Sequence, residues 1–381
     1  MPSGYKKDYN NHSVYIPPFK GVDTDLTTVT FGGFEVDKYI NSQPSAKNEA
    51  GAAWYDVAHS GSAGSVPSIS KPGVPAWDYI TFPQAMIACC NRGKGWHLMS
   101  AFEWASLAFL AKKQGTMPHG GNANVDPPSD SAYTTEIAQL DKHLHAEAAT
   151  YHRALPGSGP NTWAHNHLAS GVFDLQGLVY QWTMLMMSTD GYPYVPANLD
   201  VTYTGSPYGR GTTSGSGGAT PTLTCDGAGV NWLKAWTVDE FNADCWLYVA
   251  ETGAFYQVVD TTATTIILAN GAAPGDITAT FCIFKLVATD ITSGMTSGHK
   301  ILTLRDADAS LKGFALPATS SSSGSASYGN DAFYYDKTAV RAALRGGAFF
   351  DAAGAGVFFL SLYYAPSYSN YIIGFRACKA L

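Results

Sequence analysis

Two apolar stretches early in the chain have the spacing and the end signals of helices. The stretch FPQAMIACC covers residues 82–90 and is followed by Asn91. The next stretch, residues 101–112, carries a mostly apolar face and begins after Ser100, which can form a capping box with Glu103. The sequence therefore predicts one helix over each stretch.

Short strand patterns dominate the rest of the chain, as in VTFGGFEVDKYI at 29–40 and ILTLRD at 301–306. Residues 245–271 also have the pattern of short strands, separated by a Thr-Gly turn and a Thr-rich turn. Stretches rich in Gly, Ser and Thr, which are typical of loops and linkers, interrupt the chain at 60–65, 209–222 and 320–327. We therefore expect a small all-β insert within an α+β protein that has few helices.

These patterns predict four successive parts of the chain. They are an N-terminal segment at 1–28, the first part of the main domain at 29–211, the all-β insert at 212–290, and the second part of the main domain at 291–381.

The composition is that of a globular protein with ample material for a core, since 45% of the 381 residues are hydrophobic and 13% are aromatic. The net charge of −7 comes from 30 acidic and 23 basic residues, spread without long runs. A basic patch for nucleic acid or an anionic membrane is therefore not indicated. The start lacks the apolar region of a signal peptide, and no stretch approaches the roughly 20 apolar residues that span a bilayer. We expect no membrane insertion.

The stretch SLYYAPSYSNY at 361–371 places four tyrosines among serines, an asparagine and a proline. A core strand would alternate branched aliphatic with polar residues, and a disordered tail would contain few aromatic residues. Tyr363 and Tyr364 are adjacent and would point to opposite faces of a strand. The pattern favours a contact surface, and an aromatic core strand is the alternative.

Cysteine and histidine spacing does not indicate a metal site. None of the six cysteines forms a CxxC pair, and a disulfide could join Cys225 to Cys282 or Cys245 to Cys282. The histidines gather at His143, His145 and His152 around Glu147 and at His165 and His167, without an H-E-x-x-H motif. We expect no metal and no cofactor.

Four stretches resemble, in order, the motifs of formylglycine-generating-enzyme-type C-type lectin domains. They are FGGFEVDKYINSQ at 31–43, AWDYITFPQAMIACCNRGKGWHLMSAFEWASLA at 76–108, ALPGSGPNTWAHNHLASGVFDLQGLVYQWT at 154–183, and ALRGGAFF with IGFRACK at 343–379. The resemblance implies an α+β C-type lectin fold with two helices and short antiparallel sheets, carrying the insert. It makes Trp104 and Trp182 core anchors, and Arg376 a fork onto buried carbonyls or a carboxylate. Gln176 and Gln181 depart from the family pattern.

The final segment, about 344–376, resembles the variable region of proteins diversified by diversity-generating retroelements. In those systems adenines in Asn-type codons are randomised, which never yields Lys, Glu, Gln, Met or Trp, and residues 346–376 contain none of these five. The resemblance implies a displayed, ligand-binding set of Ala348, Phe350, Asp351, Gly354, Phe359, Ser361, Tyr363, Tyr364, Tyr368, Asn370, Tyr371 and Ile372. Tyr, Ser and Asn are also the residues that antibody loops favour for contact.

Alternation within this segment predicts which side chains face the solvent. The apolar framework residues expected to turn inward are Phe349, Val357, Phe358, Leu360, Leu362 and Ile373. A strand through Leu362 would then present Phe359, Ser361 and Tyr363 together on an outer face.

The resemblance implies a receptor-recognition protein that is not an enzyme, whose partner is a protein ligand or a cell-surface receptor. It implies a place on a virion surface, such as a tail tip, or on a cell surface. A surface adhesion or structural protein of the same fold, without diversification, is one alternative. The other is a formylglycine-generating oxidase, which holds Cu(I) on a closely spaced cysteine pair; in the C-terminal region only Cys378 is present. The motifs of a Ca²⁺-dependent sugar site are absent from the sequence.

Overall fold

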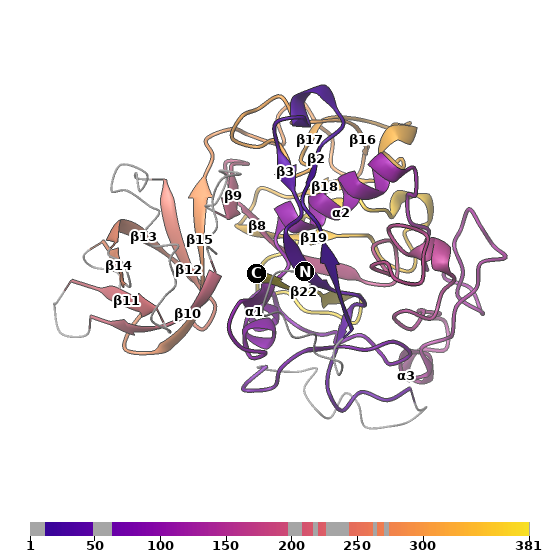
Figure 1. The fold of residues 1–381 in the computed structure, drawn as a ribbon, viewed down its shortest axis with the longest axis horizontal. Helices are drawn as coiled ribbons and strands as arrows, with labels where there is room; N and C mark the ends of the chain where they lie inside the picture. Colours follow the sequence, from indigo (N-terminus) through magenta and orange to yellow (C-terminus); the bar gives the residue numbers. More distant parts are fainter. Residues whose placement is uncertain are drawn as a thin grey trace.

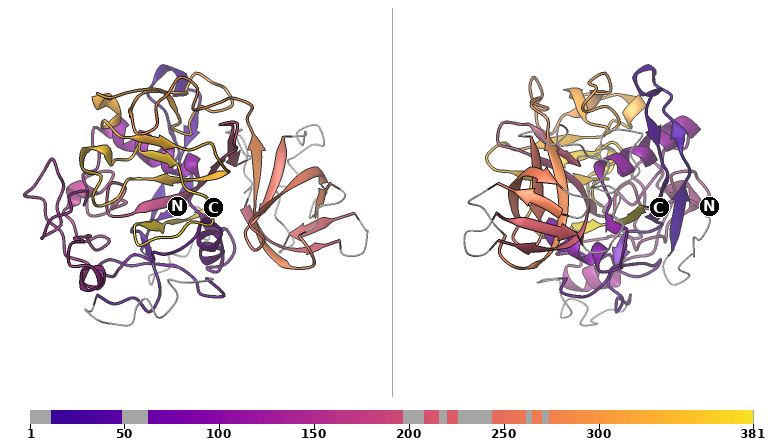
Figure 2. Two further views of the ribbon diagram at one scale, coloured as in Figure 1. Left: turned by 180° about the vertical axis from the view of Figure 1, so that it is seen from behind. Right: turned by 60° about the vertical axis from the view of Figure 1, so that its left-hand side comes forward.

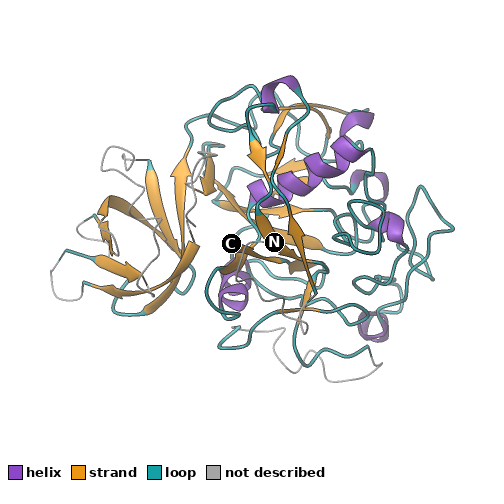
Figure 3. Ribbon diagram, viewed as in Figure 1, coloured by secondary structure: helices purple, strands orange, loops and turns teal. Residues whose placement is uncertain are grey.

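A computed structural model describes residues 12–48, 63–196, 208–215, 220–225, 244–261, 265–269 and 274–380. It consists of a main body and a barrel that projects from one side of it, on the left in Figure 1. Strands prevail over helices, with 33% of the described residues in strands and 13% in helices. Figure 3 shows strands in both the barrel and the main body.

The largest sheet has twelve strands and runs through both the barrel and the main body. Across the sheet its strands are β10 (Tyr208–Ser214), β11 (Thr222–Cys225), β14 (Thr265–Leu268), β13 (Ala254–Thr261), β12 (Cys245–Val249), β15 (Thr278–Leu286), β9 (Pro193–Pro196), β8 (Tyr180–Met187), β19 (Arg341–Arg345), β20 (Leu360–Leu362) and β18 (Phe333–Tyr335), with β21 (Ile373–Phe375) also paired to β8.

The predicted fold class, an α+β C-type lectin fold with two helices and short antiparallel sheets, is wrong: the protein is mostly β, with one large mixed sheet. The reason lies in β15, which pairs with β10 and β12 in the barrel and with β9 in the main body. The strands of the two parts therefore share one ladder of backbone hydrogen bonds instead of forming separate short sheets.

The barrel closes because β10 pairs with both β11 and β15, which joins the two ends of a six-stranded antiparallel path. Its interior is packed by apolar side chains that include Leu247, Val258, Phe281 and Ile283, all buried. Among the described strands, closure leaves the barrel without a free edge. The residues between β11 and β12, 226–243, lie outside the described part of the chain.

Smaller sheets complete the main body. One has four strands in the order β1 (Ser13–Ile16), β4 (Phe34–Asp37), β22 (Ala377–Ala380) and β7 (Trp96–Leu98), and three two-stranded sheets pair β2 (Phe19–Lys20) with β3 (Thr30–Phe31), β5 (Asn41–Ser42) with β6 (Ile69–Ser70), and β16 (Lys300–Leu304) with β17 (Pro317–Ser321). Residues close to the two ends of the chain thus meet in one sheet, as β4 and β22 show.

The two predicted helices are present as α1 (Phe82–Cys90) and α2 (Ala101–Gln114). At α2, the Ser100 hydroxyl accepts from the Glu103 amide and the Glu103 carboxylate accepts from the Ser100 amide, so the predicted capping box forms. The described residues include a third helix, α3 (Lys142–Glu147), which the sequence pattern did not predict.

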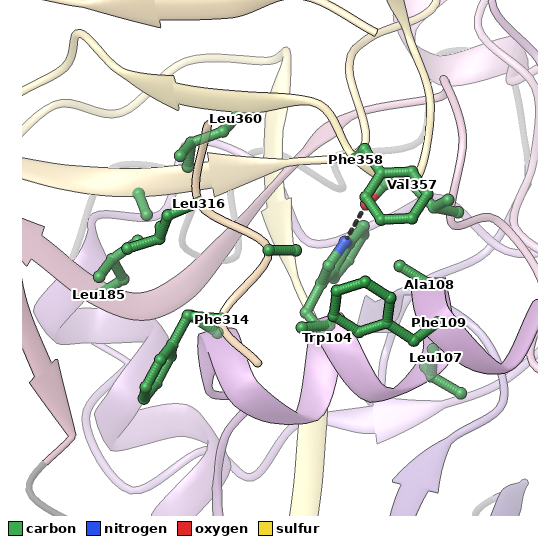
Figure 4. Packing of buried hydrophobic residues seen from close by; sticks show 14 of the residues in the cluster. Trp104, Leu107, Ala108, Phe109, Leu185, Phe314, Leu316, Val357, Phe358 and Leu360 are labelled. Carbon is green, nitrogen blue, oxygen red and sulfur yellow. Dashed lines mark hydrogen bonds between the residues drawn. The ribbon is translucent and has the colours of Figure 1, made fainter. Parts of the chain in front are cut away.

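Two tryptophans anchor two apolar clusters, one on each face of the central sheet strands. Trp104 on α2 is buried against Phe109 and Phe358, and its indole donates to the Val357 carbonyl at 2.7 Å (Figure 4). Trp182 on β8 is buried in the second cluster and donates to the Ile80 carbonyl at 2.9 Å. The predicted role of both residues as core anchors is confirmed.

Arg376 also takes the predicted place. Its buried guanidinium donates to the carbonyls of Asp37 and Phe173, each at 2.7 Å, and to the Gln181 side chain at 3.2 Å. The end of the chain is thereby joined to β4 and to the loop before β8.

Neither of the two possible disulfides forms, because both would need Cys282, which is a buried free thiol. The side chain of Cys225 lies outside the described part of the structure. Among the described residues, no helix has the length and apolar character needed to cross a membrane.

Candidate ligand-binding surface

The backbone of the C-terminal segment is held by main-chain groups from other parts of the fold. The carbonyl of Tyr364 accepts from the Ala342 amide at 3.1 Å, and that of Asn370 accepts from the Tyr79 amide at 3.0 Å. Similar bonds run from Phe82 to Pro366 at 3.0 Å, from Tyr180 to Ile372 at 2.8 Å, and from Asp336 to Leu362 at 3.0 Å. These bonds use only backbone atoms of the segment, so they do not depend on its side chains.

Buried ionisable side chains hold the segment from beneath. The Asp331 carboxylate accepts from the amides of Phe358 and Phe359, at 2.7 and 3.1 Å. Burial raises the pKa of Asp331 well above its ordinary value, while these two amides and Arg345 oppose the shift. On the other side of the segment, the buried Arg153 donates to the Tyr371 carbonyl.

Arg153 is itself fixed by two carboxylates. It donates to Asp78 at 2.7 Å and to Asp141 at 2.7 and 3.0 Å, and all three side chains are buried. This arrangement links α3, whose first turn is capped by Asp141, to the loop that carries Tyr371. The position of this loop is therefore determined by side chains that lie outside the segment.

The framework residues expected to turn inward all do so. Phe349, Val357, Phe358, Leu360, Leu362 and Ile373 are buried. This part of the alternation prediction is confirmed.

The predicted displayed set divides into three groups. Phe350 and Tyr363 are exposed, at 44% and 49%. The partly exposed members are Asp351, Gly354, Tyr364, Tyr368, Asn370 and Tyr371. The buried members are Ala348, Phe359, Ser361 and Ile372.

For these four buried residues the prediction of an outward-facing side chain is wrong. The clearest cases are Phe359 and Ser361, which are 1% and 3% exposed. The cause is the position of β20, an interior strand between β18 and β19 with apolar clusters on both sides. Alternation along β20 therefore separates two buried faces, not a buried face from a solvent face.

The aromatic rings of the segment join a continuous network. Neighbouring ring centroids are 4.9–6.3 Å apart along the series Tyr79, Tyr371, Tyr151, Phe349, Phe350, Tyr180, Phe359 and Tyr334. A second series runs through Tyr363, Tyr364 and Tyr368, with separations of 5.4 and 4.4 Å.

The two series lie beside each other. The pKa of Tyr180 is raised by burial, then by Asp351, with Tyr364 and Tyr334 adding to the shift. The pKa of Tyr371 is raised by burial, then by Tyr151 and Tyr79, with Tyr368 adding to it. We use the term aromatic surface for the members that are partly or fully exposed: Tyr79, Tyr151, Tyr334, Phe350, Tyr363, Tyr364, Tyr368 and Tyr371.

Three residues of the aromatic surface come from outside the C-terminal segment, and no local pattern in the sequence predicts that they belong to it. Tyr79 precedes α1, Tyr151 follows α3, and Tyr334 lies on β18. Tyr79 has a φ of 50°, a left-handed conformation that aromatic residues rarely adopt. Only the tertiary fold brings these three residues next to Tyr371 and Phe359.

Asp351 is the acidic group of this region. One of its oxygens accepts from the Tyr180 hydroxyl at 3.0 Å and the other from the Ala348 amide at 2.8 Å. Burial raises the pKa of Asp351, although these two hydrogen bonds oppose the shift. Within the described ranges, no Lys, Arg or His forms an ion pair with it.

The histidine clusters take part in local hydrogen bonding. His143 is buried and bonded to the Lys47 carbonyl, and His145 lies beside His152 with a ring separation of 5.2 Å. His165 accepts from the Val172 amide at 2.9 Å and has a pKa lowered to about 4, mainly by burial. His167 bonds to the Met117 carbonyl at 3.0 Å. Among the residues that the structure describes, no group of three or more His, Cys, Asp or Glu could hold a metal ion.

No protein-family model and no curated protein matches this sequence. A solved structure titled Major Tropism Determinant U1 Variant is similar to this chain, with a TM-score of 0.30 and 11% sequence identity. The match covers 96% of this chain and 55% of the chain in that structure. The chain thus spans about half the length of that protein.

Proposed function

We propose that this protein recognises a protein ligand or cell-surface receptor through the aromatic surface, and that a diversity-generating retroelement diversifies the exposed residues of that surface. The observation that carries the proposal is a contrast within the C-terminal segment between its backbone, which the rest of the fold holds in place, and its exposed side chains. Backbone bonds and buried side chains from elsewhere fix its course, while Phe350 and Tyr363 extend into solvent.

A variable binding site requires a backbone that is held independently of the side chains it displays. A side chain can be exchanged without loss of the fold when it lies outside the core and its backbone is held independently. Tyrosine offers a large amphipathic contact area and orders few rotatable bonds, which suits it to recognition. Clustered exposed aromatic residues normally mark a binding site. The absence of Lys, Glu, Gln, Met and Trp from residues 346–376 agrees with diversification at adenines.

In this proposal the protein binds and does not catalyse, and it needs no cofactor. Its place is a virion surface, as in the tail tip of a phage, where exchange of surface residues would change the receptor that is recognised. The buried members Ala348, Phe359, Ser361 and Ile372 would then act through the shape they give to the surface above them.

Two matched libraries test the proposal. The first library replaces Phe350, Tyr363, Tyr364, Tyr368 and Tyr371 with the residues that randomised adenines in an Asn-type codon can encode. The second library introduces the same set of residues at the buried positions Val357, Phe358, Leu360, Leu362 and Ile373. Each library is displayed on yeast, and resistance to protease reports folding.

We expect most members of the first library to remain folded and few of the second. Selection of the first library against an unrelated purified protein should then yield binders. Equal loss of folding in the two libraries, or a folded first library without binders, would overturn the proposal.

A further inference from the structure

We propose that the aromatic surface binds a cationic group of its ligand, a guanidinium or an ammonium from a lysine or arginine side chain, at Asp351. The inference rests on the proposed function and adds the chemical class of the group that is recognised. It follows from three observations: the carboxylate, the rings around it, and the charge of the surrounding residues.

The carboxylate of Asp351 is positioned and partly accessible. Bonds from the Tyr180 hydroxyl at 3.0 Å and the Ala348 amide at 2.8 Å fix its orientation. Each oxygen has a second lone pair left for another donor. Its side chain is only partly exposed, so the carboxylate has already lost part of its hydration in the fold before it accepts a strong, charge-assisted bond from a cation.

Aromatic side chains lie near this carboxylate. Tyr180 bonds to it directly, and the ring of Phe350 lies 6.3 Å from that of Tyr180. Tyr334 and Tyr364 are close enough that Asp351 helps to raise their pKa values, after burial at Tyr334 and after burial, Tyr368 and Tyr363 at Tyr364. The faces of such rings attract a cation, most of all the planar guanidinium of arginine, which can stack on a ring while it donates to a carboxylate.

The basic side chains of this region are already committed elsewhere. Arg345 and Arg376 are the only basic residues at 344–376, and both are buried and bonded to backbone carbonyls. Arg153, which reaches the Tyr371 carbonyl, is bound to two carboxylates. These three arginines are therefore not available to pair with Asp351, and its carboxylate is left to pair with a cationic group of a ligand. Position 351 also belongs to the set that adenine changes could alter, and an asparagine there would have the same shape without the charge.

The test begins with a library of short random peptides selected on the immobilised protein. Peptides that also bind a variant with both Phe350→Ala and Tyr363→Ala are discarded, which leaves those that need the aromatic surface. We expect these peptides to be enriched in Arg and Lys, and Asp351→Asn to weaken their binding by about tenfold or more.

Glu251→Gln is the matched control. Like Asp351, Glu251 accepts a hydrogen bond from a backbone amide, that of Thr280 at 2.7 Å, but it lies on the barrel. It removes the same charge from the protein and should leave peptide binding unchanged. A second measurement needs no variant: N-acetyl-arginine methylamide should displace the selected peptides from the unaltered protein, and the neutral N-acetyl-citrulline methylamide should not.

The outcomes separate the two proposals. Peptides that need the aromatic surface but lack cationic enrichment, or that citrulline displaces as well as arginine, would overturn the assignment of Asp351 and leave the proposed function standing. A selection in which every peptide also binds the double variant would overturn the proposed function itself.

Discussion

Truncation of two adjacent residues, Leu362 and Tyr363, should have very different effects on stability. Leu362 is fully buried at the end of β20, in the cluster that also contains Trp104. Tyr363 is 49% exposed, and its one ring contact among the described residues is an edge-on contact with Tyr364 at a centroid distance of 5.4 Å. The backbone bond from Asp336 to the Leu362 carbonyl involves neither side chain, so it survives both changes.

The magnitudes follow from these surroundings. Leu362→Ala removes a fully buried side chain and leaves a cavity, which costs about 2–5 kcal/mol of unfolding free energy. Tyr363→Ala removes one exposed aromatic contact and should cost about 0.5–1 kcal/mol. Urea unfolding followed by far-ultraviolet circular dichroism measures both values on the same chain. Equal losses for the two variants, or a larger loss for Tyr363→Ala, would show that the tyrosine belongs to the core and would refute the reasoning.

Three further predictions concern the interior and the metal content. Trp182→Ala should cost about 4–6 kcal/mol in urea unfolding, since it leaves both a cavity and an unpaired carbonyl; a loss below that of Tyr363→Ala would contradict this. Burial raises the pKa of Asp174 to about 7, so its neutral form stabilises the fold at low pH, and this contribution is lost as the pH rises from about 4 through about 7. The unfolding free energy of Asp174→Asn should not show that loss across this pH range. A loss as large as that of the unaltered protein would refute the prediction. Elemental analysis of the purified protein should find neither copper nor zinc in stoichiometric amount, and copper near one per chain would revive the oxidase alternative.

Features that depend on neighbouring residues could be predicted from the sequence. The helices α1 and α2 follow from apolar spacing and from caps that lie within three residues of each helix start. The inward direction of Leu360 and Leu362 follows in the same way from their apolar character. Such signals are local, and the structure bears them out.

Features that depend on distant pairing could not be predicted. The pairing of β15 with β9, which merges the barrel with the main sheet, leaves no trace in the pattern of either strand. The burial of Phe359 and Ser361 has the same origin, because alternation shows that a strand has two faces but not what covers each face. Tyr79 and Tyr151 reach the aromatic surface only through the tertiary fold.

The central claim, that the exposed side chains of the C-terminal segment are diversified for binding, is tested most directly by sequencing the DNA around the gene. The proposal predicts a reverse transcriptase gene nearby and a near-identical copy of the stretch that encodes residues 344–376, with differences only at adenines. The differing codons should include those of Phe350, Tyr363 and Tyr371 and should spare those of Leu360 and Leu362. If the copy is absent, or if its differences fall on the buried framework codons, the claim is contradicted.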